Sequence, residues 1–150
     1  MMSFKRILVP IDGTEATERA IDASVALASQ LGASIVGFLA ESAPPVRGGE
    51  PPRGLLEPDP LDPEAMTAER ARPVLTRFEA AAQAARVPFE GVCDRVPPRL
   101  DKAIIDAAES HGCDMIVMVS HGRGAFGEFL FGSQSKAVLA GTKLPLLVVH

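Results

Sequence analysis

The sequence lacks the features that mark disulfide-rich, metal-binding and membrane proteins. Its two cysteines, Cys93 and Cys113, lie far apart, with no CxxC pair and no cluster of histidines beside them. We therefore interpret both as small buried hydrophobic residues in a reducing compartment. No apolar run reaches the length of a membrane span, and residues 1–6 lack the apolar core of a signal peptide. We expect a cytoplasmic protein that does not associate with membranes.

An excess of basic charge is also lacking. Fifteen Lys and Arg residues stand against nineteen Asp and Glu residues, which gives a net charge of −4 and no basic cluster. Proteins that bind nucleic acid generally rely on Lys and Arg to neutralise phosphates, so nucleic acid is not an expected partner. A small ligand or another protein is the more natural partner for this composition.

The chain instead shows a regular alternation of strand and helix patterns. Its 150 residues fit one domain, residues 1–150, that can bury a core without disulfides or metals. The alternation predicts an α/β fold: an open, parallel five-stranded sheet with right-handed crossovers and helices on both faces. The expected strands are residues 4–11, 33–40, 88–96, 115–119 and 145–150, and the expected helices are residues 15–30, 63–85, 98–111 and 133–140.

Three local features modify this pattern. Charged and apolar residues alternate in 88–96, which predicts a half-solvated strand at an edge of the sheet. Pro73 falls inside a helical pattern and predicts a kink or break near residues 69–72. Residues 42–63 hold seven of the thirteen prolines and three glycines, so we expect a mobile loop insertion, with a lid over a ligand as the alternative.

The most informative stretch is the connection between the apolar run 115–119 and the helix that Ser133 can cap. This connection contains four glycines. Its backbone can therefore approach a ligand closely, and the free amides and dipole at the start of the following helix favour an anion. Phosphate is the first ligand to consider, although the dinucleotide-binding and Walker patterns are both absent.

The spacing in this connection resembles the nucleotide loop of the universal stress protein family. ATP-binding members carry glycine, two residues, glycine, nine residues, and then glycine followed by serine or threonine. Here Gly122, nine residues and Gly132-Ser133 follow that pattern, while Val119 replaces the first glycine. The resemblance covers the chain outside 42–63. It implies the strand order 3-2-1-4-5, in which Asp12 and the glycine-rich loop meet where the sheet reverses its winding.

By this resemblance the ligand is ATP or a related adenine nucleotide, with or without Mg²⁺. Asp12 would hold the divalent metal or the polar groups of the nucleotide, and the backbone at Ala40 would lie along the adenine. The nucleotide-binding positions that the resemblance implies are Asp12, Ala40, Val119, His121, Gly122, Arg123, Gly132, Ser133, Gln134 and Ser135.

Three of these side chains also have an ordinary structural role open to them. Asp12 is a candidate helix N-cap, with Glu15 completing a capping box. His121 is a candidate loop histidine that hydrogen-bonds the backbone and orders the turn. Arg123 is a candidate solvated side chain that contacts no ligand.

No catalytic constellation is present: the sequence has no nucleophile elbow, no zinc spacing and no motif that pairs its carboxylates. The resemblance implies a nucleotide-binding module of the stress response, with an unidentified protein partner. It also implies a homodimer through strand 145–149, which is too apolar for an exposed edge. One alternative is a nucleotide-free interaction protein of the same fold, its crevice weakened by Val119. Another is an enzyme, either a slow ATP hydrolase or a nucleotidyl transferase.

Overall fold

The structure is a computed structural model that describes residues 3–13, 15–41, 68–95, 100–119 and 133–149. Strands and helices alternate along the chain as the sequence predicts. The elements are β1 (Arg6–Ile11), α1 (Glu15–Leu31), β2 (Ser34–Glu41), α2 (Ala68–Ala84), β3 (Phe89–Arg95), α3 (Leu100–Ser110), β4 (Met115–Val119), α4 (Ser133–Gly141) and β5 (Leu146–Val149). The expected insertion 42–63 lies outside the described residues.

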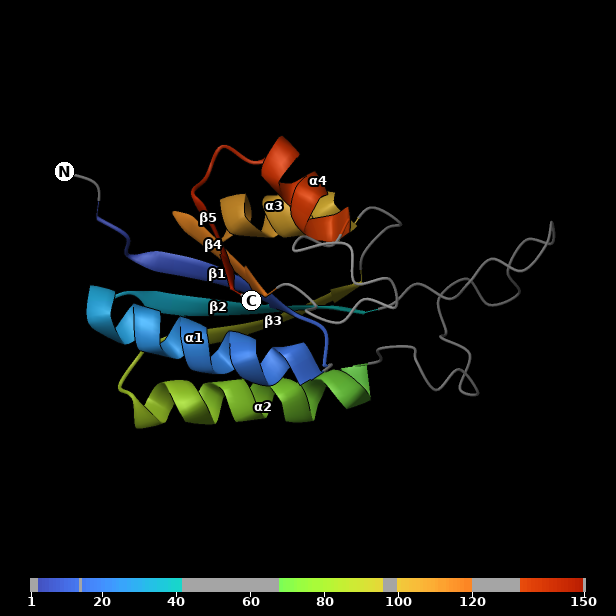
Figure 1. The fold of residues 1–150 in the computed structure, drawn as a ribbon. Coiled ribbons are helices and arrows are strands. Elements are labelled where there is room, and N and C mark those ends of the chain that lie inside the picture. Colours follow the sequence, from blue (N-terminus) through green and yellow to red (C-terminus); the bar gives the residue numbers. More distant parts are fainter. Residues whose placement is uncertain (1–2, 14, 42–67, 96–99, 120–132, 150) are drawn as a thin grey trace.

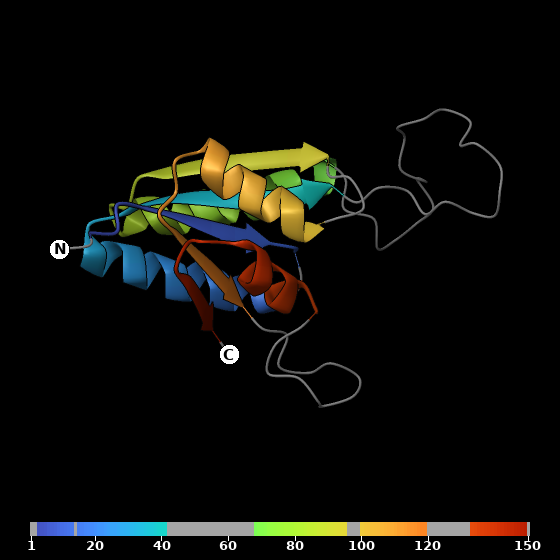
Figure 2. The same ribbon diagram turned by 90° about the horizontal axis from the view of Figure 1, so that it is seen from above.

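The strands form one five-stranded sheet in the order β3-β2-β1-β4-β5, and every neighbouring pair is parallel. The α/β fold class and the strand order 3-2-1-4-5 are therefore confirmed. Helices α1 and α2 cover one face of the sheet, and α3 and α4 cover the other (Figures 1 and 2). None of the described helices is long and apolar enough to cross a membrane.

Each face of the sheet has its own hydrophobic core because successive side chains of a strand point to opposite faces. In β1, Ile7, Val9 and Ile11 belong to the core beneath α1 and α2, whereas Leu8 belongs to the core beneath α3 and α4. Ile7, Leu8 and Val9 are completely buried. This burial on both faces explains why β1 and β4 are continuous apolar runs in the sequence.

Strand β3 is an outer strand of the sheet, as its mixed pattern predicts. None of its described side chains is fully buried, and Glu90, Gly91 and Asp94 are exposed. The predicted edge position and partial solvation of this segment are confirmed.

Of the kink or break predicted near residues 69–72, the break does not occur, because α2 runs without interruption from Ala68 to Ala84 (Figure 1). The kink stays a prediction. A proline inside a helix costs about 3 kcal/mol, through one lost hydrogen bond and a steric clash. Ala71 lies before the proline and Val74 and Phe78 after it, and all three are buried in the same core. Packing on both sides of Pro73 therefore offsets the local cost and keeps the helix continuous.

Candidate functional site

Parallel strands bring their carboxyl ends to one edge of the sheet, and three of the predicted site residues lie at that edge. Ile11 of β1 pairs with Leu39 of β2, so Asp12 and Ala40 are the next residues along these two neighbouring strands. Val119 is the last residue of β4, on the other side of β1. Residues that are more than a hundred positions apart in the sequence are thus brought to the ends of three adjacent strands.

The pairing of β1 with β4 is short at this edge. The ladder between β1 and β2 continues to Ile11 and Leu39, whereas the ladder between β1 and β4 stops at Leu8 and Ile116. The two strands are therefore not paired beyond Leu8, on the side from which Asp12 and Val119 continue. This is also where the chain reverses the direction in which it winds the sheet, the usual ligand position in open α/β sheets.

Pro10 explains why the ladder stops. The carbonyl oxygen of Lys5 accepts a hydrogen bond from the Ser34 N–H, which leads into β2, at 2.9 Å. The carbonyl oxygen of the next residue, Arg6, accepts one from the Asp114 N–H, which leads into β4, also at 2.9 Å. Successive residues of a strand point their backbone groups to opposite sides, so the nitrogen of Pro10 points toward β4. Proline has no N–H, and the next bond of that ladder cannot form.

The turn after β1 holds Asp12 through a buried threonine. Gly13 has a φ of 80°, a left-handed conformation that suits glycine, and its N–H donates to Thr17 Oγ1 at 2.9 Å. The Thr17 hydroxyl donates in turn to Asp12 Oδ1 at 3.3 Å. Thr17 is only 1% exposed, whereas Asp12 is exposed. The threonine therefore fixes one carboxylate oxygen from the protein side while the carboxyl group remains accessible from outside.

Asp12 does not directly precede α1, because Gly13 is left-handed and the helix begins at Glu15. The capping-box interpretation pairs Asp12 with Glu15, whose side chain lies outside what the structure describes, so it stays a prediction.

The remaining predicted site residues divide into two groups. Ser133, Gln134 and Ser135 form the first turn of α4, where backbone N–H groups have no partner within the helix. His121, Gly122, Arg123 and Gly132 lie outside the described residues.

Metal-ligating side chains do not gather at this edge. Within the segments that the structure describes, no three His, Cys, Asp or Glu side chains form a group that could hold a metal ion. Asp12, the predicted metal ligand, is therefore not part of a preformed metal centre there.

Two contributors to this edge, Pro10 and Thr17, were not predicted from the sequence. A proline inside an apolar central strand is a signal in itself, because it interrupts a ladder on one side. The signal for Thr17 is weaker: a threonine five residues after Asp12, at a position that α1 turns toward the sheet.

Comparison with known proteins gives a consistent family match. The sequence profile of the universal stress protein family matches residues 3–150. The protein described as "Universal stress protein in QAH/OAS sulfhydrylase 3'region" of Thermus aquaticus is 34% identical over 147 residues, which are 98% of this chain and 99% of that protein.

Solved structures share the fold at lower identity. A universal stress protein in complex with cAMP is 20% identical, with a TM-score of 0.69, over 99% of this chain and 98% of that one. The universal stress protein of Archaeoglobus fulgidus in complex with dAMP is 15% identical, with a TM-score of 0.67, over 99% of this chain and 100% of that one. The likeness extends over the whole length of each chain.

Proposed function

Because the chain belongs to the universal stress protein family, we propose that it binds ATP or a related adenine nucleotide as a regulatory module of the stress response. The observation that carries this proposal is the arrangement at the carboxyl edge. An accessible carboxylate, held by a buried threonine, follows the stretch of β1 that is no longer paired with β4.

The ligands of two structural relatives support the same chemical class. One relative is a complex with cAMP and the other a complex with dAMP, so both ligands combine adenine with a single phosphate. The spacing of Gly122, Gly132 and Ser133 supports a phosphate position at the start of α4.

The described residues fit distinct parts of such a ligand. The amides in the first turn of α4 would receive phosphate oxygens, since they have no partner within the helix. Backbone groups at the ends of β2 and β4, at Ala40 and Val119, would lie along the base and the ribose. The Asp12 carboxylate would accept hydrogen bonds from the ribose or hold a cation that accompanies the phosphates.

A single carboxylate also suits Mg²⁺ in this setting. Mg²⁺ is usually bound by one or two carboxylates together with phosphate oxygens and water, and dedicated all-protein cages are uncommon. Asp12 would therefore hold the ion only with a nucleotide present, which agrees with the lack of a preformed cluster among the described residues.

We also propose that the chain forms a homodimer through β5. This strand ends the sheet opposite β3, and Leu147 in its middle is 39% exposed. Apolar outer strands tend to pair with another chain, and a two-fold contact buries the same patch on both copies. Such a dimer would let the nucleotide state of one copy influence what the pair binds.

The nucleotide proposal is tested by mass spectrometry of small molecules released from the purified, denatured protein. We expect an adenine nucleotide from the wild type and much less from Asp12→Ala. Asp22→Ala is the matched control, because Asp22 is an exposed carboxylate on the surface of α1. If the purified protein releases no nucleotide and takes up none from millimolar ATP, the nucleotide proposal is wrong. The chain would then be a nucleotide-free interaction protein of the same fold, the alternative suggested by Val119 in place of a glycine.

A further inference from the structure

The outer edge of β3 presents backbone groups to the outside. The Ile35 N–H of β2 donates to the Pro88 carbonyl oxygen at 2.9 Å, and Ile35 is in register with Phe89. In a parallel ladder, residues alternate between facing the neighbouring strand and facing away from it. Phe89 and Gly91 therefore point their N–H and C=O groups away from β2, and no strand among the described residues pairs with this edge.

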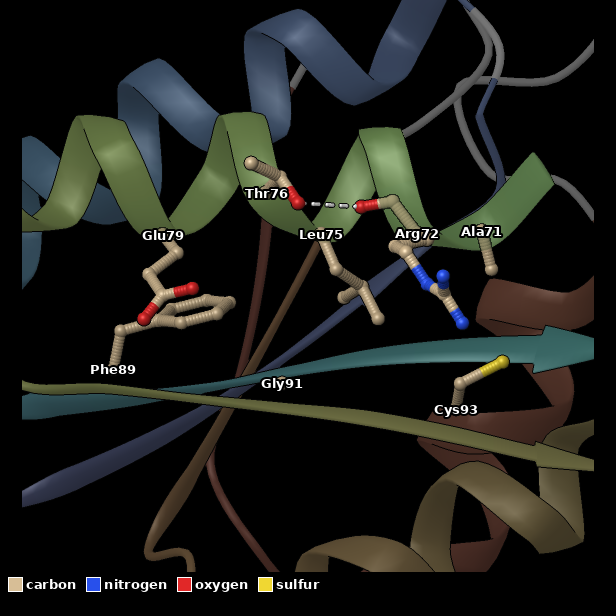
Figure 3. A pocket seen from close by; sticks show the side chains of 8 residues that line it. All are labelled: Ala71, Arg72, Leu75, Thr76, Glu79, Phe89, Gly91 and Cys93. Carbon is tan, nitrogen blue, oxygen red and sulfur yellow. Dashed lines mark hydrogen bonds between the residues drawn. The ribbon is translucent and has the colours of Figure 1, made fainter. Parts of the chain in front are cut away.

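A groove runs along Phe89, Gly91 and Cys93, between β3 and α2 (Figure 3). Its volume is about 400 Å³, and its floor includes the side chains of Leu75 and Phe89. Arg72 and Glu79 lie toward opposite ends, with Arg72 on the side of Cys93 and Glu79 beside Phe89. From Arg72 to Glu79 the helix advances seven residues, which is about 10 Å along its axis. The groove is therefore about as long as three residues of an extended strand.

Gly91 opens the middle of this groove. A Cβ placed there would lie 3.4 Å from the Phe89 ring and 3.6 Å from Leu75 Cδ2, which are ordinary van der Waals contacts. The space above Gly91 therefore accommodates a small apolar group, whether from a substituted side chain or from an added chain. Outward backbone groups lie beside an apolar notch, a combination typical of sites where a peptide adds to a sheet.

The opposite face of β3 carries two carboxylates. Val92 packs in the core beneath α3 and α4, and by strand alternation Glu90 and Asp94 share its face. Glu90 forms an ion pair with Arg6 and lies 3.7 Å from His111 Nδ1, while Asp94 is exposed. An added strand would place every second side chain next to these carboxylates, so cationic side chains suit that face.

We propose that the outer edge of β3 binds an extended basic peptide segment of a partner protein. The segment adds to the sheet as a further strand, with small apolar side chains in the groove at Gly91 and Lys or Arg beside Glu90 and Asp94. A second copy of β3 is disfavoured at this edge in the register centred on Val92. Antiparallel pairing centred on Val92 would oppose Glu90 of one copy with Asp94 of the other, and like charges directly opposite each other are destabilising.

The test uses blocked hexapeptides in which Lys alternates with Ala, Val, Leu or Phe, titrated into the isotopically labelled full-length protein and followed by amide NMR. At least one peptide is expected to shift the Phe89 and Gly91 amides and slow their hydrogen exchange. The same peptide with every second backbone nitrogen methylated keeps its side chains but loses edge hydrogen bonds. It should bind at least about tenfold more weakly, and so should the peptide in which Glu replaces Lys.

Two variants separate groove binding from other effects. Gly91→Leu fills the notch and should weaken binding at least about tenfold, whereas Gly91→Ala should stay within about threefold of the wild type because its Cβ makes ordinary contacts. Thermal unfolding confirms that both variants fold. Asp12→Ala should bind the peptide like the wild type, so this result is separable from the nucleotide proposal.

Three results would overturn the proposal. The first is that no peptide shifts the Phe89 and Gly91 amides at millimolar concentration. The second is that the methylated peptide, or the Gly91→Leu protein, gives unchanged affinity. The third is that the same amides become protected with rising protein concentration alone, which would assign the edge to a second copy of the chain.

Discussion

The hydroxyl of Thr17 is a buried side-chain group that holds Asp12 in place. It accepts the Gly13 N–H and donates to Asp12 Oδ1 from a position that is 1% exposed. Thr17→Val keeps the shape of the side chain but removes both interactions. We expect its affinity for Mg²⁺-ATP to fall roughly tenfold, because a hydrogen bond to a charged group is worth about 1.5–3 kcal/mol.

Calorimetric titration of folded protein measures this effect, and Thr17→Ser provides the control. Serine retains the hydroxyl and should restore affinity to within about threefold of the wild type, even if it packs less well. If the valine and serine variants bind the nucleotide equally, Thr17 has only a packing role.

The buried thiol of Cys113 leads to a second prediction, which concerns the free energy of unfolding at alkaline pH. Burial raises the pKa of its thiol above the ordinary value of 9.0, although the Arg6 guanidinium beside it lowers the pKa and so opposes burial. The folded protein therefore holds this proton more tightly than the unfolded chain does. This contribution to stability is fully present below about pH 9 and is lost as the pH rises through the folded-state pKa.

Chemical unfolding at about pH 8 and about pH 10.5 checks this prediction. The free energy of unfolding should fall less between these pH values in Cys113→Ala than in the wild type. An identical decrease in the two proteins would contradict the assignment to Cys113.

At the scale of the elements, Pro10 ends the hydrogen-bond ladder between β1 and β4, because it has no N–H to continue it. Pro10→Val supplies an N–H directed toward β4, and we expect that amide to become protected as the ladder extends. The new bond adds about 1 kcal/mol, but losing proline increases the freedom of the unfolded chain by about 0.4–1 kcal/mol. The net change in stability should therefore be small, while nucleotide affinity falls because the strand ends draw together.

Hydrogen exchange of the position 10 amide, together with a nucleotide titration, measures both effects on the same variant. If the amide is protected and affinity is unchanged, the separation of β1 and β4 is not required for binding.

The elements also show how far the sequence determines the fold. Apolar runs such as 115–119 identify strands buried on both faces, and glycines such as Gly32 mark helix ends, so the alternation is predictable. The strand order follows from the family resemblance, because local patterns do not specify which strands pair. The break predicted at Pro73 is wrong because packing by Val74 and Phe78 is a tertiary effect.

The candidate site is less predictable for the same reason. Asp12, Ala40 and Val119 lie at strand ends as expected, but local patterns do not predict the left-handed φ of Gly13 or the Thr17 hydrogen bond to Asp12. The effect of Pro10 depends on which neighbour its nitrogen faces, and only the register of β1 with β2 and β4 determines that.

For the whole molecule, the exposed Leu147 side chain of β5 leads to a prediction about the proposed homodimer. Leu147→Lys places a charge at the outer strand and should shift the protein from dimer to monomer in sedimentation at micromolar concentration. Leu139→Lys is the matched control, because Leu139 is 57% exposed on α4 and lies outside that strand. A monomeric wild type would contradict the proposed dimer.

The proposed function of the molecule requires that it bind an adenine nucleotide although Val119 stands where a glycine is expected. Val119 ends a paired, extended strand, and β-branched residues with a negative φ are favoured in strands. The valine is therefore compatible with the local backbone, and we expect nucleotide binding in spite of it.

Calorimetric titration of the wild type and Val119→Gly with ATP and Mg²⁺ decides whether this requirement is met. We predict saturable binding to the wild type, with affinities of the two proteins within about tenfold of each other. No detectable binding to the wild type at millimolar ATP, with binding restored by Val119→Gly, would contradict the proposed function.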